Sequence, residues 1–401
     1  MKKLALFCLT LALMLCGGTV KAEKLSKKQI EKQITGFMEE CRTNGLAVVM
    51  VKGDKVVYQN AFGWKDKEAG IPLDINDMFR IASISKSFSG VSIMQLVEAG
   101  KLSLEDDVND ILGMNIRNPR YPDIPITVKM LLSHTSSMQD GGGAARYTDL
   151  TYIDESKTPI DEIREKSYLP YAPGQGYKYC NRALNTIGVI IEKVSGERFD
   201  NYVLNHILRP MGLTEKEAGY NVDTLDNSKF VSLYIYNKKK DSLEKSQVAY
   251  ARKRGEKAVE AGTYVIGRDG HGWSPTGGMK ISAPNLAKWM MTLRDGGMAP
   301  NGTRILSEAG TKKLLTPVTP ADPGTQYCLT TRTETRFIDG KTLKGHTGSA
   351  QGLKSCMFFC PGEDWGFVCI ASSTKLDQIN NVYKIYYNTV NLLYEQYIKE
   401  K

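Results

Sequence analysis

The chain has 401 residues, of which 41% are hydrophobic and 24% charged, so it can bury a sizeable core and is not intrinsically disordered. This length favours two domains or one large elaborated domain, and the composition excludes collagen-like, coiled-coil and repeat proteins. The formal net charge is +9. The densest basic run, Lys238 to Lys240, has no interleaved aromatic residues and no finger motif, so we expect no nucleic-acid partner.

The first 22 residues have the pattern of a cleaved signal peptide. Two lysines precede an apolar run from Leu4 to Leu15, and Val20 and Ala22 supply small residues where a signal peptidase reads them. The run is shorter than the roughly 20 residues that span a membrane, and no later run reaches that length. We therefore expect a periplasmic or secreted protein without a transmembrane segment. A lipid anchor at Cys16 ranks second, because bulky Leu15 precedes it.

Strand patterns lie at the two ends of the chain and helical patterns lie between them. Ser26 precedes a helical apolar pattern, and residues 46–51 and 55–58 are expected to pair as a hairpin around Gly53 and Asp54. Helices are predicted at 85–99, 128–133, 182–195, 199–208 and 283–295. Strands are predicted at 327–331, 335–338, 352–359 and 366–372, followed by a closing helix at 383–397.

These elements predict an α/β (α+β) fold in which an antiparallel sheet is flanked by the N- and C-terminal helices and interrupted by a mostly helical domain. The α/β domain would be discontinuous, residues 23–75 and 276–401, and the helical domain would cover 76–275. Two long polar loops, 136–170 and 220–273, are of a length that usually signals function or disorder.

Six cysteines follow the signal segment, with no CxxC pair and no histidines at zinc-finger spacing, so no metal is expected. A symmetric turn at residues 361–364 would place Cys356 opposite Cys369. A cross-strand disulfide is one alternative. Two reduced, buried thiols are the more common state in strand cores.

A serine three residues before a lysine places both side chains on one helix face, where a desolvated amine can accept the hydroxyl proton. The spacing occurs at Ser83/Lys86, Ser242/Lys245 and Ser372/Lys375. The second pair lies in a charged stretch, and in the third the serine ends a strand, where positions i and i+3 face opposite sides. Only Ser83 is expected to open a helix, and Lys86 is the sole charge before Glu98. On its own, this pattern also fits a helix cap with a snorkelling lysine.

Further motifs accompany this pair. They read FRIASISKSF at 79–88, QLVEAGKLSLEDDV at 95–108, ITVKMLLSHTS at 126–136, PGQGYKYCN at 173–181 and HTG at 346–348. Their order resembles that of class C β-lactamase-like serine hydrolases over residues 30–395, most weakly across 220–273. That family includes β-lactamases, D-alanyl-D-alanine peptidases, D-amino acid peptidases, esterases and some acyltransferases.

The resemblance implies a role for each matching residue. Ser83 resembles the acylated nucleophile and Lys86 its proton acceptor. Tyr179 resembles the phenol that passes a proton to the leaving group, provided that nearby positive charge lowers its pKa. Asn181 resembles the substrate-orienting amide. Without the other motifs, Tyr179 would more often be a half-buried aromatic residue, and Asn181 would more often be a turn or capping residue.

The third motif begins with His346 where β-lactamases have lysine. Thr347 and Gly348 keep the pattern on a strand, where glycine would allow close approach of a substrate backbone. The Ser349 and Ser83 amides would form the oxyanion hole. Imidazole is mostly neutral at pH 7, so replacing the lysine by histidine removes a permanent positive charge from the motif. Strong β-lactamase activity is therefore not expected.

Smaller departures are Ser137, where the family commonly has glycine, and Cys180, where it has serine. We expect Cys180 to pack without acting as a second nucleophile, because no acidic or basic residue is evident near it. His134 is expected to hold a loop. Residues 274–279, SPTGGM, resemble the glycine-bearing segment beside the cleft, where Gly277 and Gly278 would approach the substrate.

The sequence therefore predicts a hydrolase that acylates Ser83 with an amide or ester from a small molecule or peptide, and needs no metal or cofactor. An acyltransferase is the alternative if residues 220–273 form an apolar lid that excludes water. A non-catalytic, penicillin-binding sensor is the second alternative. The substrate and the oligomeric state are not defined by the sequence.

Overall fold

A computed structural model describes residues 24–141, 167–320 and 325–399. The expected signal peptide and most of the loop at 136–170 lie outside the described residues. The main sheet has seven strands in the order β3-β2-β1-β12-β11-β10-β9, each antiparallel to its neighbours. Strand β1 (Gly45–Lys52) pairs with β12 (Trp365–Ala371), so the two ends of the chain meet in the middle of one sheet, as predicted.

The remaining strands of this sheet are β2 (Lys55–Asp66), β3 (Ile71–Pro72), β9 (Arg332–Glu334), β10 (Leu343–Ala350) and β11 (Leu353–Phe359). Smaller sheets join β4 (Met78–Arg80), β8 (Lys280–Ser282) and β5 (Ala218–Gly219); β6 (Tyr234–Asn237) and β7 (Ser242–Lys245); and β13 (Gln378–Ile379) and β14 (Val382–Tyr383).

The helices of the described residues are α1 (Lys27–Glu40), α2 (Lys86–Glu98), α3 (Val108–Leu112), α4 (Val128–Leu132), α6 (Asn181–Ser195), α7 (Phe199–Val203), α8 (Arg254–Glu260), α9 (Ala283–Arg294), α10 (Glu308–Leu314) and α11 (Lys384–Tyr397). Short helical turns are η1 (Ala82–Ser85), η4 (Leu204–Leu208), η5 (Asn227–Lys229) and η6 (Gly270–Trp273).

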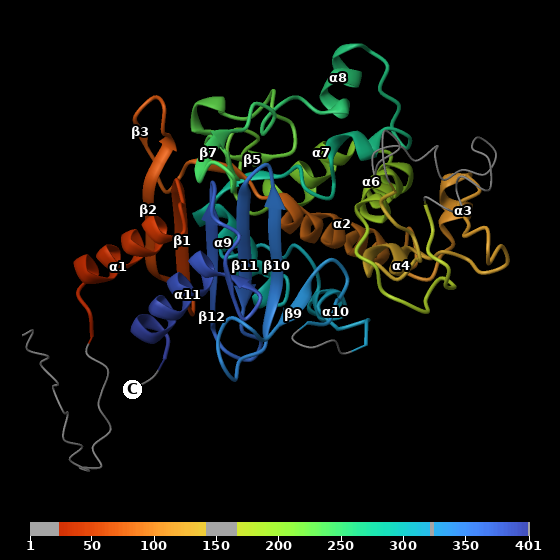
Figure 1. Cartoon of the computed structure of the whole chain (residues 1–401). Helices are drawn as coiled ribbons and strands as arrows, with labels where there is room; N and C mark the ends of the chain where they lie inside the picture. Colours follow the sequence, from red (N-terminus) through yellow and green to blue (C-terminus); the bar gives the residue numbers. More distant parts are fainter. Residues whose placement is uncertain (1–23, 142–166, 321–324, 400–401) are drawn as a thin grey trace, which may run out of the picture.

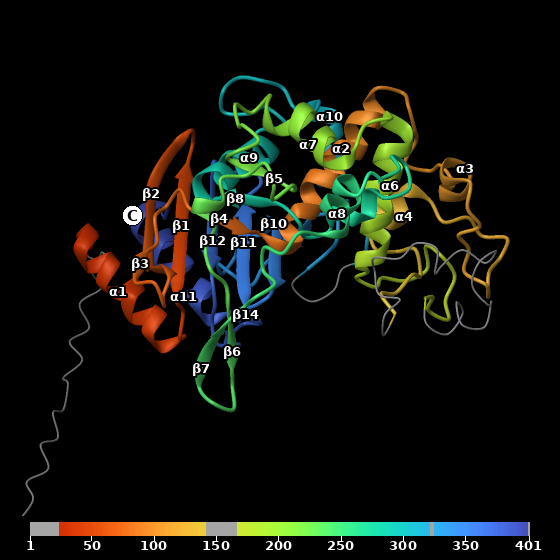
Figure 2. The ribbon, with the colours of Figure 1, turned by 90° about the horizontal axis from the view of Figure 1, so that it is seen from above.

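Both faces of the sheet are buried, because alternate residues of β1 enter two different cores. Leu46 and Val48 pack with α1 and α11, whereas Ala47 and Val49 pack in the larger core that contains α9 and α2. Figures 1 and 2 show α1 and α11 side by side against the sheet. The sheet is thus a rigid frame with the helical part of the chain attached beside β10.

Helix α2 connects this frame to the helical part. In Figure 1 it leads from the edge of the sheet near β10 toward α6 and α4. Trp289 of α9 fixes its position, because the indole stacks on Phe88 at a centroid distance of 4.3 Å and donates a hydrogen bond to Ser87 Oγ at 2.8 Å. Residues of α2 from both its faces are buried, which explains why its sequence lacks a polar face.

Two predicted strands are wrong. Residues 327–331 and 335–338 are not strands, and only β9 (Arg332–Glu334) forms between them. Thr330 has a left-handed φ of 72°, and the Cys328 amide donates to the Thr331 carbonyl, so the segment turns instead of extending. Its apolar residues are buried although they lie in a loop, and in the sequence such a buried loop has the same apolar pattern as a buried strand.

The segment 220–273, expected to be a long polar loop, contains secondary structure. It holds the β6–β7 hairpin, helix α8 and the turns η5 and η6. Buried Glu256 explains part of this order, because its carboxylate accepts hydrogen bonds from the Lys253 and Val222 amides. Part of this segment is therefore ordered by hydrogen bonds to a buried carboxylate, which an apolar pattern in the sequence does not reveal.

The β11–β12 hairpin places Cys356 directly opposite Cys369, as the symmetric turn predicted. Both are fully buried free thiols, and burial raises the pKa of Cys356 well above its usual range. In residues 24–141, 167–320 and 325–399, no helix has the length and apolar content needed to cross a membrane.

We predict that Trp289→Ala lowers the free energy of unfolding by about 3–5 kcal/mol, because it leaves a large cavity between α9 and α2. The matched control is Trp64→Ala, since Trp64 on β2 is 42% exposed and should cost no more than about 0.5 kcal/mol. Urea unfolding measures both. Equal costs for the two variants would contradict the packing of α2 on α9.

Candidate active site

Ser83, expected to open a helix, lies in the short turn η1 between β4 and α2, and the α-helix itself begins at Lys86. The preceding residue, Ala82, has a left-handed φ of 50°, a conformation that costs a non-glycine residue on the order of 1 kcal/mol or more. The turn is held on both sides. The Ile81 amide donates to the Met279 carbonyl at 3.0 Å, and Ser355 Oγ donates to the Ile81 carbonyl at 2.9 Å. Ser83 is thereby fixed at the wall of a cleft.

Lys86, at the first position of α2, is 0% exposed. Its Nζ lies 3.1 Å from Ser83 Oγ, 3.0 Å from Asn181 Oδ1 and 2.9 Å from the carbonyl oxygen of Thr276. The predicted serine and lysine pair is therefore formed, and the family-derived Asn181 is in direct contact with the lysine.

The donors and acceptors around Lys86 define its proton arrangement. Asn181 Nδ2 donates to Asp140 Oδ2 at 2.9 Å, which leaves Asn181 Oδ1 to face Lys86 Nζ at 3.0 Å. The Thr276 carbonyl is also an acceptor. A neutral amine has two N–H bonds for these two acceptors, and its lone pair then faces the Ser83 hydroxyl.

Burial lowers the pKa of Lys86 to about 7, and Arg80 acts in the same direction, whereas Asp140 and Cys180 raise it. The amine is therefore substantially uncharged near neutral pH. The amine lies within hydrogen-bond distance of the Ser83 hydroxyl and can accept its proton, which is the geometry of a general base.

A lowered pKa alone does not identify the base. Lys280 on β8 is equally buried, and burial lowers its pKa to about 7 as well. Its Nζ, however, donates to the Tyr220 carbonyl, and Lys280 is not among the residues that line the Ser83 cleft. What distinguishes Lys86 is the serine hydroxyl at 3.1 Å.

Tyr179 lies beside the pair, with Lys86 Nζ 4.9 Å from the centre of its ring. Its hydroxyl is buried and interacts with Ser83 without a hydrogen bond of regular geometry. Burial raises the pKa of Tyr179, and the interaction with Ser83 only partly opposes this. The expectation that nearby charge lowers this pKa is wrong, because desolvation dominates. The phenol is thus protonated at neutral pH and suited to donate a proton.

Strand β10 forms the opposite wall. Beyond Gly345 it no longer pairs with β9, so its free edge borders a cleft of about 480 Å³ lined by Ser83, Tyr179, Asn181, Arg332, His346, Thr347, Gly348 and Ser349, among others. All the site residues predicted from the sequence except buried Lys86 line this single cleft. Lys86 lies behind the cleft surface, in contact with Ser83.

Gly348 is required by the protein's own packing. A Cβ atom there would lie 2.3 Å from the Ile81 carbonyl oxygen and 2.3 Å from Ser355 Oγ. The absence of a side chain therefore lets β10 approach the turn that holds Ser83, a role that differs from the expected approach of a substrate backbone. Likewise, the nearest contacts of a Cβ at Gly278 are Trp273 and Ser274, within its own turn.

His346 is buried, and both ring nitrogens have protein partners: Nε2 is 3.1 Å from Tyr327 Oη, and Nδ1 contacts the Thr347 carbonyl. Burial, together with the positive charges of Arg332 and Lys86, holds the pKa of His346 well below its usual range. The third motif therefore supplies no cation at neutral pH, in agreement with the sequence argument.

Several contact residues were missed by sequence reasoning. Asp140 contradicts the expectation that nothing acidic lies near Cys180, since Cys180 Sγ donates to Asp140 Oδ1 at 3.5 Å. Burial and Asp140 raise the pKa of Cys180, so this thiol is not a nucleophile. Tyr327 and Arg332 were also missed, because no local pattern marks them, and Thr276 lies in the SPTGGM segment but was given no role.

Two other departures from the family pattern have a structural explanation. Ser137 has a left-handed φ of 60°, the conformation for which glycine is favoured, and its Oγ accepts a hydrogen bond from Asn118 Nδ2 at 3.0 Å. His134 holds the adjacent loop, as expected, because its Nδ1 accepts the Cys180 amide at 3.1 Å.

Comparison with known proteins gives the same assignment over nearly the whole chain. A family model described as Beta-lactamase matches residues 30–385. Penicillin-binding protein 4* of Bacillus subtilis (strain 168) is 30% identical over 198 residues, which cover 49% of this chain and 42% of that protein. The match thus spans less than half of this relative.

Among solved structures, the octameric penicillin-binding protein homologue from Pyrococcus abyssi superimposes with a TM-score of 0.70 at 24% identity, over 92% of this chain and 77% of that one. A class C beta-lactamase superimposes with a TM-score of 0.69 at 16% identity, over 94% and 97% of the two chains. These similarities identify the fold as that of serine β-lactamases and penicillin-binding proteins, and the predicted fold class is confirmed.

The neutral state of Lys86 predicts a pH-dependent stability. Between pH 7 and 10.5 the folded protein holds this amine neutral, whereas the unfolded chain binds a proton there. Folding then releases a proton, so wild-type stability rises with pH across this window. Lys86→Met lacks this contribution. The variant's free energy of unfolding relative to wild type should therefore fall by about 1.4 kcal/mol per pH unit from pH 7 to 10.

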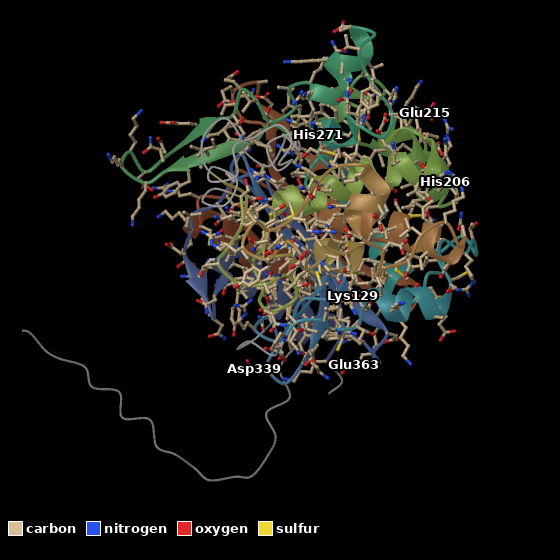
Figure 3. All side chains as sticks on the ribbon, turned by 90° about the vertical axis from the view of Figure 1, so that its right-hand side faces the viewer. Lys129, His206, Glu215, His271, Asp339 and Glu363 are labelled. Atoms are coloured by element: carbon tan, nitrogen blue, oxygen red, sulfur yellow. The ribbon has the colours of Figure 1, made fainter. Side chains whose placement is uncertain are left out.

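Urea titrations at several pH values measure this difference, and the buried Lys280 cancels because both proteins contain it. Lys129→Met, at an exposed position labelled in Figure 3, controls for loss of a surface lysine. A difference between Lys86→Met and wild type that stays constant with pH would show that Lys86 is charged in the folded protein.

Proposed function

The chain belongs to the Beta-lactamase family of serine hydrolases, and from this membership we propose that it hydrolyses an amide or ester through an acyl-enzyme at Ser83. The observation that carries the proposal is the contact of 3.1 Å between the buried Lys86 amine and the Ser83 hydroxyl. No step of the proposed chemistry requires a metal or cofactor.

In the first step, Lys86 Nζ accepts the Ser83 hydroxyl proton as Oγ forms a bond to the substrate carbonyl carbon. The carbonyl π electrons move to oxygen, and the amides of Ser83 and Ser349 are proposed to stabilise this oxyanion. Tyr179 then donates its phenolic proton to the departing amine or alcohol, and the ammonium of Lys86 returns a proton to Tyr179. The products are the free leaving group and the Ser83 ester.

In the second step, water attacks the Ser83 ester and gives its proton to the neutral Lys86 and Tyr179 pair. The new tetrahedral intermediate collapses, Ser83 Oγ recovers a proton, and a carboxylic acid leaves. The lowered pKa of Lys86 and the raised pKa of Tyr179 support this division of roles, because the amine is free to accept a proton and the phenol has one to give.

Arg332 supports a substrate with an anionic group. It lines the cleft together with Ser83, pairs with Glu334 at 3.1 Å, and its buried Nε has no hydrogen-bond partner within the described part of the chain. Because His346 is neutral, this guanidinium supplies positive charge near the third motif, in a cleft that Arg336 also lines. We propose that it binds a free carboxylate, such as the C-terminus of a short peptide, and that β-lactams are poor substrates.

Hydrolysis is favoured over acyl transfer by the course of residues 220–273. The acyltransferase alternative required this segment to form an apolar lid, yet none of its residues lines the Ser83 cleft. The sensor alternative is disfavoured by the complete set formed by Ser83, Lys86 and Tyr179. Export by a signal peptide at residues 1–22 remains part of the proposal, supported by the sequence pattern alone.

Replacing the nucleophile tests the proposal. Ser83→Ala should lower the hydrolysis rate of a p-nitrophenyl ester by about 10³-fold or more, because no acyl-enzyme can form. Ser92→Ala removes a buried serine hydroxyl from the adjoining helix α2 and should retain activity. Mass spectrometry of the quenched reaction should find the acyl mass on the peptide that contains Ser83. A Ser83→Ala enzyme with the wild-type rate would exclude the proposal.

A pair of substrates tests the role of Arg332. For a peptide with a free C-terminal carboxylate and the same peptide as its amide, wild type should prefer the acid. Arg332→Gln should reduce this preference by about tenfold or more, because a charge-assisted hydrogen bond is lost. The ratio of the two kcat/KM values is the readout, and general damage to the enzyme cancels from it. An unchanged ratio would remove Arg332 from substrate binding.

A further inference from the structure

A chain of hydrogen bonds crosses the cleft beneath the reacting groups. The Cys180 amide donates to His134 Nδ1 at 3.1 Å, His134 Nε2 lies 3.1 Å from Tyr327 Oη, and Tyr327 Oη lies 3.1 Å from His346 Nε2. His346 Nδ1 then contacts the Thr347 carbonyl. The chain starts at the residue between Tyr179 and Asn181 and ends on β10, so it joins the two walls of the cleft.

The two backbone groups at the ends of this hydrogen-bond series determine where each proton lies. A backbone amide can only donate, so His134 Nδ1 accepts and the His134 proton is on Nε2. A backbone carbonyl can only accept, so His346 Nδ1 carries the proton and its Nε2 accepts. Tyr327 Oη therefore accepts from His134 and donates to His346. Each donor has one acceptor, whereas a protonated His346 would donate from Nε2 and leave the Tyr327 hydroxyl proton without an acceptor among these residues.

We propose that Tyr327 is a positioning residue whose hydroxyl keeps His346 as the neutral Nδ1-protonated tautomer and thereby holds β10 in place against the Tyr179 wall. In this arrangement His346 presents no N–H to the substrate, and the motif acts by fixing the Thr347 carbonyl next to Gly348 and Ser349. The histidine is then a structural connection where other family members place a cation.

The surroundings support this assignment. Tyr327 is held at its backbone and at its ring, since its amide donates to Thr319 Oγ1 at 2.8 Å and its ring packs against His134 at a centroid distance of 4.7 Å. Burial, with the adjacent Lys86, holds the pKa of His134 well below its usual range. The titratable and charged groups that face these hydrogen-bonded residues are Lys86 from α2, Arg332 from β9, Tyr177 and Tyr179 from the segment before α6, and Cys328 next to Tyr327.

The wild-type protein itself gives the first test, because the sequence has only four histidines. With ¹⁵N-labelled histidine, long-range ¹H–¹⁵N NMR distinguishes Nδ1–H from Nε2–H rings. We expect His134 as Nε2–H and His346 as Nδ1–H at pH 7. His206 and His271, labelled in Figure 3, lie in η4 and η6 and serve as in-chain references. Single His→Gln variants assign the signals, and any other tautomer at His346 overturns the proposal.

The second test removes only the hydroxyl. Tyr327→Phe should lower kcat by about tenfold with a smaller change in KM, and shift the acidic limb of kcat/KM upward by about one pH unit. The shift follows because His346 Nε2 loses its donor and can bind a proton. Tyr58→Phe, a buried tyrosine on β2 in the opposite core, is the matched control and should change neither quantity.

Unchanged kcat and pH profile in Tyr327→Phe would overturn the positioning role. The kinetic test rests on the proposed acyl-enzyme chemistry, whereas the NMR test does not. If Ser83 proves not to be acylated, the tautomers of wild type still decide the arrangement of the chain, so the two failures are distinguishable.

Discussion

The site depends on one constraint: the buried amine of Lys86 has no solvent around it, so it must meet the hydrogen-bonding needs of its protein neighbours itself. The three partners of Lys86 are an amide oxygen, a carbonyl oxygen and the Ser83 hydroxyl, and the neutral amine can meet all three with two donated protons and one lone pair. Desolvation makes that form favourable, and Asp140 keeps the Asn181 oxygen turned toward the amine. The base is thus prepared by the fold before any substrate arrives.

The frame around this amine explains how it stays buried. Helix α2 starts directly after the strained turn at Ala82, and Gly348 lets β10 pack against that turn. Stacking of Trp289 on Phe88 fixes α2 on the layer that covers the sheet. A second amine, Lys280, is equally buried but donates to the Tyr220 carbonyl. Among the described residues burial of a lysine is therefore not unique, and what sets Lys86 apart is the serine hydroxyl beside it.

The sequence predicted what local spacing and apolar periodicity encode. The pairing of β1 with β12, the register of Cys356 with Cys369, and the Ser83 and Lys86 pair are all confirmed as contacts. Asp140 and Tyr327 could not be found, because each meets its partners across long chain separations and no repeat marks them. Residues 327–331 were misread as a strand, since a buried loop and a buried strand have the same apolar composition. The Tyr179 pKa was misjudged because burial outweighs charge, which spacing does not reveal.

The charge state of Lys86 during the reaction is the claim on which the account stands. The most direct measurement is the rate constant for acylation of Ser83 by an activated ester, followed in a stopped-flow burst from pH 5 to 10, with Lys280→Met as the control for a second buried amine. The account predicts a rate constant that rises with an apparent pKa of about 7 and then levels off, both in wild type and in the control. A rate constant that is flat with pH, or that falls as pH rises through 7, would contradict it.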